Sequence, residues 1–307
     1  MQPNNLFELS RLKHTKSLFW LAVLSAVGAV VLVPLWIFDA RELGGVSVWE
    51  KPLKFFVSSA IFSFTFSWLS SFITKGSRWV KVAGLFIAIS LAVELVLIAA
   101  MAALGTTSHF NVSTPTAIVI WSLMATFITI VLFSTLFLSI TILLQKQQEL
   151  NLKLTLVLGS LNTAVGMGLA YLMTSPTANQ LASFQGIAGA HAVGVSDGGP
   201  GLPFLGWSTV AGDLRVGHFF GLHSIQVAVI LLAVTLVLPI ALRVPLLIVG
   251  NFTWLGFVGL VTWQSLRAEP FSSPSQLSLT GFGVLLAVAA VCFSILVIWQ
   301  RSRTPKR

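Results

Sequence analysis

The chain of 307 residues is apolar and basic, because 56% of its residues are hydrophobic, only 9% are charged and the formal net charge is +9. A soluble domain carries about 25% charged residues, and a chain so poor in them would expose large apolar surfaces to water. The composition therefore excludes an ordinary soluble domain and predicts a protein whose main partner is the lipid bilayer. The basic residues stand in short groups between apolar stretches, so we expect no nucleic-acid partner.

Eight apolar stretches are each long enough to cross a bilayer as a helix. About 20 residues at about 1.5 Å per residue cover a hydrocarbon core of about 30 Å. The first stretch is too long for the apolar segment of a signal peptide, so we expect it to remain as a span. The sequence predicts an all-α polytopic bundle that forms one transmembrane domain over residues 1–307. The predicted spans are residues 17–38, 53–74, 80–104, 117–143, 154–174, 214–241, 244–266 and 279–300.

The distribution of Lys and Arg predicts the orientation. With eight spans, both termini and the second, fourth and sixth loops lie on one side of the membrane. Only five of the 18 basic residues fall on the other side, which leaves thirteen on the side of the termini. By the positive-inside rule both termini are expected in the cytoplasm. The thirteen are Arg11, Lys13, Lys16, Lys75, Arg78, Lys81, Lys146, Lys153, Arg243, Arg301, Arg303, Lys306 and Arg307.

The stretch VWEKPLKFF at residues 48–56 leads into the second span. Pro52 suits the first turn of a helix, and Glu50 suits the positive end of the helix dipole. Lys51 and Lys54 are about one turn apart, and Lys54 already lies within the apolar stretch. We therefore expect the Lys54 ammonium to reach outward to the interface or to meet an acidic group. Simple anchoring at the interface is the alternative interpretation of both lysines.

Small and polar residues within the spans predict helix packing. Serines repeat along one face of the second span and glycines along the fifth, which favours close approach of a neighbouring helix over a polar pathway. Asn162 and Asn251 are expected to form hydrogen bonds between helices. Cys292 is the single cysteine, so no internal disulfide is possible. The repeated residues are Ser59, Ser63, Ser67 and Ser70, and Gly159, Gly166 and Gly168.

Glu94 lies in LAVELVL of the third span, near the middle of the bilayer. It is about 11 residues from Gly105 at the outer end, which corresponds to about 16 Å of helix. An ionised carboxylate is costly at that depth, so we expect Glu94 to be neutral or to have a cationic partner. A protonated Glu94 that hydrogen-bonds a neighbouring helix is the structural alternative to a functional role.

The sixth span opens with GDLRVGHFFGLHSIQ, which concentrates polar residues at its outer end. By helical rise His223 and Gln226 reach the depth of Glu94. His218 and His223 are five residues apart, or about 140° around a continuous helix. They therefore cannot both bind one small metal ion, but they can line two walls of one pocket. Histidines that serve only as hydrogen-bond partners between helices are the alternative. The polar residues of this segment are Asp213, Arg215, His218, His223 and Gln226.

The outer loops add further polar residues. His109 and Asn111 stand in GTTSHFN at 105–111, and His191 stands in a long Gly-rich loop at about 175–212 that we expect to fold over the outer end of the bundle. Four of the five histidines thus fall on the outer side. Together with Glu94, they predict an outward-facing pocket in the outer half of the bundle, open to a small molecule from outside.

Over most of its length the chain resembles a group of uncharacterised bacterial multi-pass membrane proteins, and four distinctive segments carry the resemblance. These segments are VWEKPLKF (48–55), GTTSHFN (105–111), AGAHAVGVSDGGPGLPF (188–204) and GWSTVAGDLRVGHFFGLHSIQ (206–226). The resemblance implies a location in the bacterial cytoplasmic (inner) membrane. It implies no activity.

Four functions remain open from the sequence, and the last of them is sensing or scaffolding without any chemistry. The first is a redox-type membrane protein that holds haem or a divalent metal through His109, His218 or His223, since imidazole is a common ligand of both. The second is a proton-coupled transporter in which Glu94 and His223 carry the proton. The third is a membrane-embedded metal-dependent hydrolase with Glu94 as base and zinc held by these histidines or Asp213, although HExxH is absent. Whether the chain is an enzyme stays open.

Overall fold

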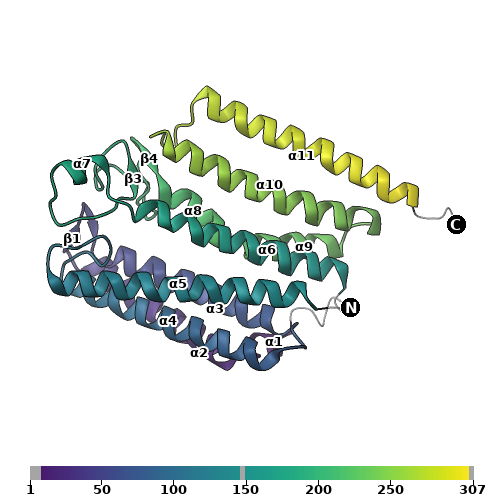
Figure 1. Ribbon diagram of the computed structural model, residues 1–307, viewed down its shortest axis with the longest axis horizontal. Coiled ribbons are helices and arrows are strands. Elements are labelled where there is room, and N and C mark those ends of the chain that lie inside the picture. The colour runs from purple at the N-terminus through teal and green to yellow at the C-terminus, as the bar shows by residue number, and fades with distance from the viewer. Residues whose placement is uncertain (1–7, 146–148, 304–307) are drawn as a thin grey trace.

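The computed structural model describes residues 8–145 and 149–303, which form a bundle of long helices running between two ends (Figure 1). One end carries β1, β3, β4 and α7, and we call it the loop end. At the other, the termini end, α1 begins and α11 stops. Three basic residues of the predicted charge asymmetry lie outside the described residues: Lys146, Lys306 and Arg307.

The secondary structure is almost entirely helical. The helices are α1 (Leu9–Leu12), α2 (Lys16–Phe38), α3 (Glu50–Ser70), α4 (Ser77–Ala103), α5 (Pro115–Leu143), α6 (Leu150–Gly168), a 3-10 helix (Leu169–Met173), α7 (Ala178–Ala182), α8 (Leu214–Leu222), α9 (Ser224–Leu236), α10 (Ile240–Leu266) and α11 (Gln276–Arg303). Two antiparallel pairs are formed by β1 (Glu42–Leu43) with β2 (Val46–Ser47) and by β3 (Ala192–Val193) with β4 (Gly212–Asp213).

Within the described part of the chain, seven helices are long and apolar enough to cross a membrane, and α8 with α9 would make an eighth. Many of their large apolar side chains are exposed, as lipid-facing residues are. The predicted all-α helical bundle and its membrane character are therefore confirmed at this level. Most predicted boundaries differ from the helices by a few residues. The largest shifts at a helix start are in α6 and α10, which begin four residues before the predicted 154 and 244.

The prediction of one continuous span at 214–241 is wrong. The helix breaks at His223, and α8 and α9 are bent by 46° relative to each other. A break exposes backbone groups that lipid cannot hydrogen-bond, so a neighbour must satisfy them. Thr163 on α6 does so, because its hydroxyl accepts the Ile225 backbone N–H at 3.0 Å. The bend therefore depends on α6 as well as on the local sequence.

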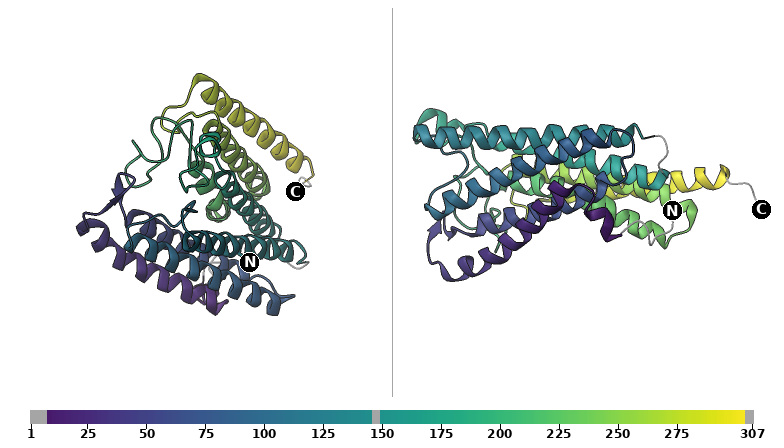
Figure 2. Two further views of the ribbon diagram at one scale, coloured as in Figure 1. Left: turned by 60° about the vertical axis from the view of Figure 1, so that its left-hand side comes forward. Right: turned by 90° about the horizontal axis from the view of Figure 1, so that it is seen from below.

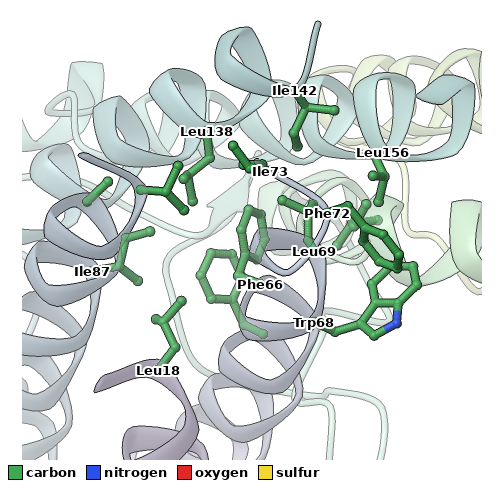
Figure 3. Packing of buried hydrophobic residues seen from close by; sticks show 14 of the residues in the cluster. Leu18, Phe66, Trp68, Leu69, Phe72, Ile73, Ile87, Leu138, Ile142 and Leu156 are labelled. Carbon is green, nitrogen blue, oxygen red and sulfur yellow. The ribbon is translucent and has the colours of Figure 1, made fainter. Parts of the chain in front are cut away.

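The apolar core lies toward the termini end of the bundle. Leu18, Phe66, Ile87, Leu138 and Leu156 are fully buried there and come from α2, α3, α4, α5 and α6 (Figure 3). The same cluster continues through residues of α9 and α10, so it joins the first half of the chain to the second. Smaller apolar clusters pack at the loop end, such as Trp49 with Leu53 and Trp207 with Val216.

The helices fall into two groups. The first group contains α2 to α5 and the second contains α6 and α8 to α11, and the main packing between the groups is α5 against α6. In the left view of Figure 2 the two groups run at an angle to each other, with the segment that precedes α8 lying at the loop end. Asn162 on α6 donates to the Asn251 backbone carbonyl of α10 at 3.0 Å, which confirms the interhelical hydrogen bond predicted for Asn162. The Asn251 amide instead donates to the Leu247 carbonyl of its own helix at 2.8 Å, so that prediction is wrong for Asn251.

The small residues of the spans allow close helix contacts, as predicted for most of them. A Cβ atom built on Gly166 would lie 2.1 Å from the Gly221 backbone carbonyl carbon of α8, whereas one on Gly168 would meet nothing within 4 Å. On α3, Ser67 donates to the Leu12 carbonyl at 2.6 Å. The Ser70 hydroxyl lies 2.6 Å from that of Thr15.

We predict that Gly166→Ala destabilises the protein and that Gly168→Ala, on the same helix, does not. The added methyl group at 166 must push α8 away from α6, and overpacking of this kind costs about 1–3 kcal/mol. Thermal unfolding in detergent measures the difference between the two variants. Equal melting temperatures for Gly166→Ala and the unaltered protein would contradict the close approach.

Candidate functional site

The polar residues of the loop end gather where several separate segments meet. They come from the first turns of α3, the loop after α4, the segment between α7 and α8, and α8 itself. The segments are tied together by backbone hydrogen bonds: the Ala188 N–H donates to the Phe110 carbonyl at 2.8 Å and the Leu214 N–H to the His191 carbonyl at 2.9 Å. These contacts bring the predicted outer loops and the start of α8 into one cluster.

Lys54 lies one turn into α3 and is paired with an acidic residue, which is one of the two outcomes that the sequence predicted for it. Its ammonium donates to Glu50 Oε1 at 2.9 Å and to the Leu205 carbonyl at 3.1 Å. Glu50 is buried at the N-terminal turn of α3, where the helix dipole favours a negative charge. Lys54 therefore holds the tip of the Gly-rich segment down onto α3.

Arg215 and Asp213 form a second pair at the start of α8. Asp213 is fully buried, caps α8 through the Arg215 N–H at 3.0 Å, and accepts the Ser208 N–H at 2.9 Å. The Arg215 guanidinium contacts both carboxylate oxygens, at 2.9 and 2.6 Å. It also donates to the Gly206 carbonyl at 2.5 Å. Leu205 and Gly206, adjacent in the chain, are thus held by two different cations.

His109 lies beside Lys51 in the loop after α4. Its Nδ1 atom is 3.1 Å from Lys51 Nζ and 2.9 Å from Ser108 Oγ. An ammonium only donates, so Nδ1 accepts and the ring proton is on Nε2. Burial, together with the positive charge of Lys51, holds the pKa of His109 well below its ordinary value of 6.5. The ring also packs near Trp121, with centroids 5.4 Å apart.

His191 forms a hydrogen bond with Asp197 within the long loop. Nδ1 lies 2.7 Å from Asp197 Oδ2, and the Ala192 N–H donates to the same carboxylate at 2.8 Å. Burial would raise the pKa of Asp197, but these hydrogen bonds outweigh it and hold the pKa at about 2. Burial lowers the pKa of His191, and Asp197 opposes that shift. The His191 ring contacts Phe110, with centroids 4.8 Å apart, so this histidine does reach the cluster.

The two histidines of the broken span are anchored to different helices. His218 Nδ1 lies 2.8 Å from the Gly166 carbonyl of α6, which can only accept, so Nδ1 carries the proton. His223, at the break, lies with Nε2 3.1 Å from Ser58 Oγ of α3. The 140° separation expected on a continuous helix does not apply, because the helix ends between the two residues. Together they connect α8 to both groups of helices.

Glu94 and Gln226 carry buried oxygens without a donor. Glu94 is only 5% exposed, so it does not face lipid, and its Oε1 has no hydrogen-bond partner in the structure. Gln226 donates to Thr65 on α3 at 3.0 Å, but its own Oε1 is equally unpartnered. Among the described residues Glu94 hydrogen-bonds no histidine.

The sequence left two residues of this cluster out of the candidate site. For Lys51 the sequence left open simple anchoring at the interface, whereas in the structure its ammonium lies 3.1 Å from His109 Nδ1, within the cluster. Asp197 was counted only for its charge. The sequence feature that could have placed Lys51 in the site is its position about one turn from Lys54 at the start of α3. No such feature marks Asp197, because its pairing depends on how its loop folds.

Within residues 8–145 and 149–303, no group of three or more His, Cys, Asp or Glu side chains is arranged to hold a metal ion. Asp213 is paired with Arg215, and it forms no metal-binding group with the histidines.

Comparisons with protein-family models, with curated proteins and with solved structures found no match to this chain.

We predict that acid destabilises the protein and that His109→Gln reduces this effect. Folding keeps His109 neutral, so below about pH 6.5 the unfolded chain takes up a proton that the folded chain refuses. The stabilisation is therefore complete above pH 6.5 and falls by at most about 1.4 kcal/mol per pH unit below it. Melting temperatures measured from about pH 8 to about pH 5 give the change of stability with pH for both proteins. Ser113→Ala, a neighbour that does not titrate, should keep the slope of the unaltered protein.

Proposed function

We propose that this chain is a bacterial inner-membrane protein of eight spans, with both termini in the cytoplasm, that carries a small solute together with a proton. The loop end would face outward, and the solute would bind at the polar cluster. The observation that carries the proposal is the 46° break between α8 and α9, which lies at His223 within this cluster. Broken helices at a polar site between two helix groups are typical of secondary transporters.

Unpartnered polar atoms support a binding role. Glu94 Oε1, Gln226 Oε1 and Ser63 Oγ are all buried without a hydrogen-bond partner. An unpaired buried oxygen costs about 1–3 kcal/mol, so a purely structural cluster would be expected to pair it. Ionisable groups inside a membrane bundle commonly belong to substrate or proton pathways. Glu94 is therefore our candidate for the proton carrier, with His223 as the group that connects the break to α3.

The Gly-rich segment supports a gate. Trp207 is buried against Phe219 of α8, with ring centroids 5.5 Å apart, while Phe204 lies 5.8 Å from the Trp36 ring of α2. The segment therefore contacts both groups of helices at the loop end. Its tip is also held by the Leu205 and Gly206 carbonyls, which accept from Lys54 and Arg215.

We predict that proteoliposomes containing the protein move protons when a transported solute is added. Vesicles loaded with a pH-sensitive dye would be tested with acetate, lactate, succinate, phosphate and glycine. At least one is expected to drive a proton flux, and Glu94→Gln should abolish it because the amide cannot exchange a proton. Ser90→Ala, one turn earlier on α4, should keep the flux. Flux that persists in Glu94→Gln would remove Glu94 as the carrier, and no flux with any solute would remove the transporter.

A haem-binding role is the second candidate, and the tautomers of two histidines favour it. His191 donates from Nδ1 to Asp197, and His218 donates from Nδ1 to the Gly166 carbonyl. Both rings therefore present an unprotonated Nε2. Each also donates its Nδ1–H to a carboxylate or carbonyl, as metal-binding histidines commonly do. A haem would be held by one or two of these imidazoles, so the absence of a three-ligand group among the described residues speaks against zinc and the hydrolase but not against haem.

The haem candidate predicts a Soret band in the purified protein. The band should shift on reduction with dithionite and should weaken strongly in His218→Ala, which removes one axial ligand. His14→Ala, at the termini end, should leave it unchanged. A colourless protein that also fails to take up added haemin would eliminate this candidate and leave the transporter.

A further inference from the structure

We propose that the start of α4 binds an anionic phospholipid, with the lipid phosphate at Arg78 and Lys81 and the upper part of an acyl chain against Val82 and Leu85. Because α3 begins at the loop end, α4 begins near the termini end (Figure 1). The lipid site is therefore at the opposite end of the bundle from the candidate functional site, and it does not depend on the proposed function.

A groove on the surface of α4 is the basis of the proposal. It has a volume of about 400 Å³ and is lined by Ser77, Arg78, Lys81, Val82 and Leu85. Residues three and four positions apart on a helix are neighbours, so these side chains lie on one face of α4. Ligand pockets commonly have volumes of about 300–1,000 Å³, so the groove is large enough to hold one lipid headgroup.

The lining of the groove changes from polar to apolar along the helix. Ser77, Arg78 and Lys81 belong to its first turns, whereas Val82 and Leu85 lie further along. The distance from the first to the last of these residues is about 12 Å at about 1.5 Å per residue. The interfacial region of a bilayer is about 5–8 Å thick on each side, so a groove of this length extends from the headgroups into the hydrocarbon.

Exposed side chains next to the groove place the membrane boundary at the same level. Trp79 is 65% exposed, and tryptophans are enriched where the headgroups meet the hydrocarbon. Further along α4, Leu85, Phe86 and Ile89 are each about half exposed, as lipid-facing residues are. The boundary between headgroups and acyl chains therefore falls between Lys81 and Leu85, within the groove.

The two cations of the groove are available to an anion. Arg78 and Lys81 are exposed, and within the described part of the chain neither is paired with an acidic side chain. Arg215 at the loop end, by contrast, is paired with Asp213. A guanidinium forms two parallel hydrogen bonds to a phosphate, and a neighbouring ammonium adds a second positive charge. Basic residues at a membrane surface attract anionic lipids in this way.

The form of the groove favours a lipid over a free phosphate ion. A phospholipid already holds its phosphate at the level of Arg78 and Lys81 and its chains at the level of Leu85, so it contacts both halves of the groove without leaving the bilayer. A choline headgroup would bring its own positive charge close to the two cations, which repel it. A lipid with a net negative charge is therefore the preferred ligand.

The test measures lipid binding to the full-length protein by native mass spectrometry from detergent solution. Dioleoyl phosphatidylglycerol is compared with dioleoyl phosphatidylcholine, which has the same acyl chains. Phosphatidylglycerol should bind about tenfold more tightly, or better. Arg78→Gln and Lys81→Gln should each lower its affinity about fivefold, and the double variant about twentyfold, with no change for phosphatidylcholine.

Matched variants keep the test decisive. Arg301→Gln removes an exposed arginine of α11 at the same end of the bundle and should leave the affinity for phosphatidylglycerol unchanged. Arg78→Lys keeps the positive charge and should retain most of the binding. Melting temperatures establish that each variant is folded, so that a lost lipid can be attributed to the lost charge.

Three results would overturn the lipid site. The first is equal affinity for the two lipids, and the second is phosphatidylglycerol binding that survives in the double variant. Inorganic phosphate is the third probe. If it displaces phosphatidylglycerol when present at the same concentration, the groove is a site for the ion alone rather than for a lipid.

Discussion

Charge inside an apolar bundle must be paired or hydrogen-bonded, and this constraint organises the loop end of the molecule. Asp213 is fully buried, and it is satisfied by the Arg215 guanidinium and by backbone N–H groups on both sides of the start of α8. Because Arg215 also binds the Gly206 carbonyl, pairing one acid fixes the course of the Gly-rich segment. Lys54 acts in the same way from α3. Satisfying these charges therefore brings together segments that are far apart in the sequence.

The two groups of helices are joined by apolar packing and by single polar contacts. Apolar side chains such as Phe66 and Leu138 pack tightly at the termini end, where they join both groups of helices (Figure 3). Between these groups, α3 and the broken span are linked by single hydrogen bonds, such as Ser58 to His223 and Thr65 to Gln226. Dense apolar packing resists rearrangement, whereas a hydrogen bond between side chains can be exchanged for one to a ligand.

The sequence predicted the helices well because their signal is local. Each span is a long apolar stretch, and Asn162 could be assigned to an interhelical hydrogen bond because a lone amide in lipid needs a partner. The partners of Lys51 and Asp197 could not be predicted, since their contacts come from loops whose paths depend on positive-φ residues such as Gly206 and on distant cations. The gathering of polar residues at the loop end was foreseen, but the individual pairs were not.

The break at His223 explains why the sixth span misled the sequence analysis and how the site is supported. The long apolar stretch after Gln226 predicted a continuous helix, and no proline marks the interruption at His223. The break is stable because α6 approaches closely at Gly166 and supplies two acceptors: the Thr163 hydroxyl for the Ile225 N–H and the Gly166 carbonyl for His218. A side chain at 166 would separate the helices and leave both donors without partners. The small residues first interpreted as packing elements are therefore what allows a polar, bent helix to exist beside the candidate site.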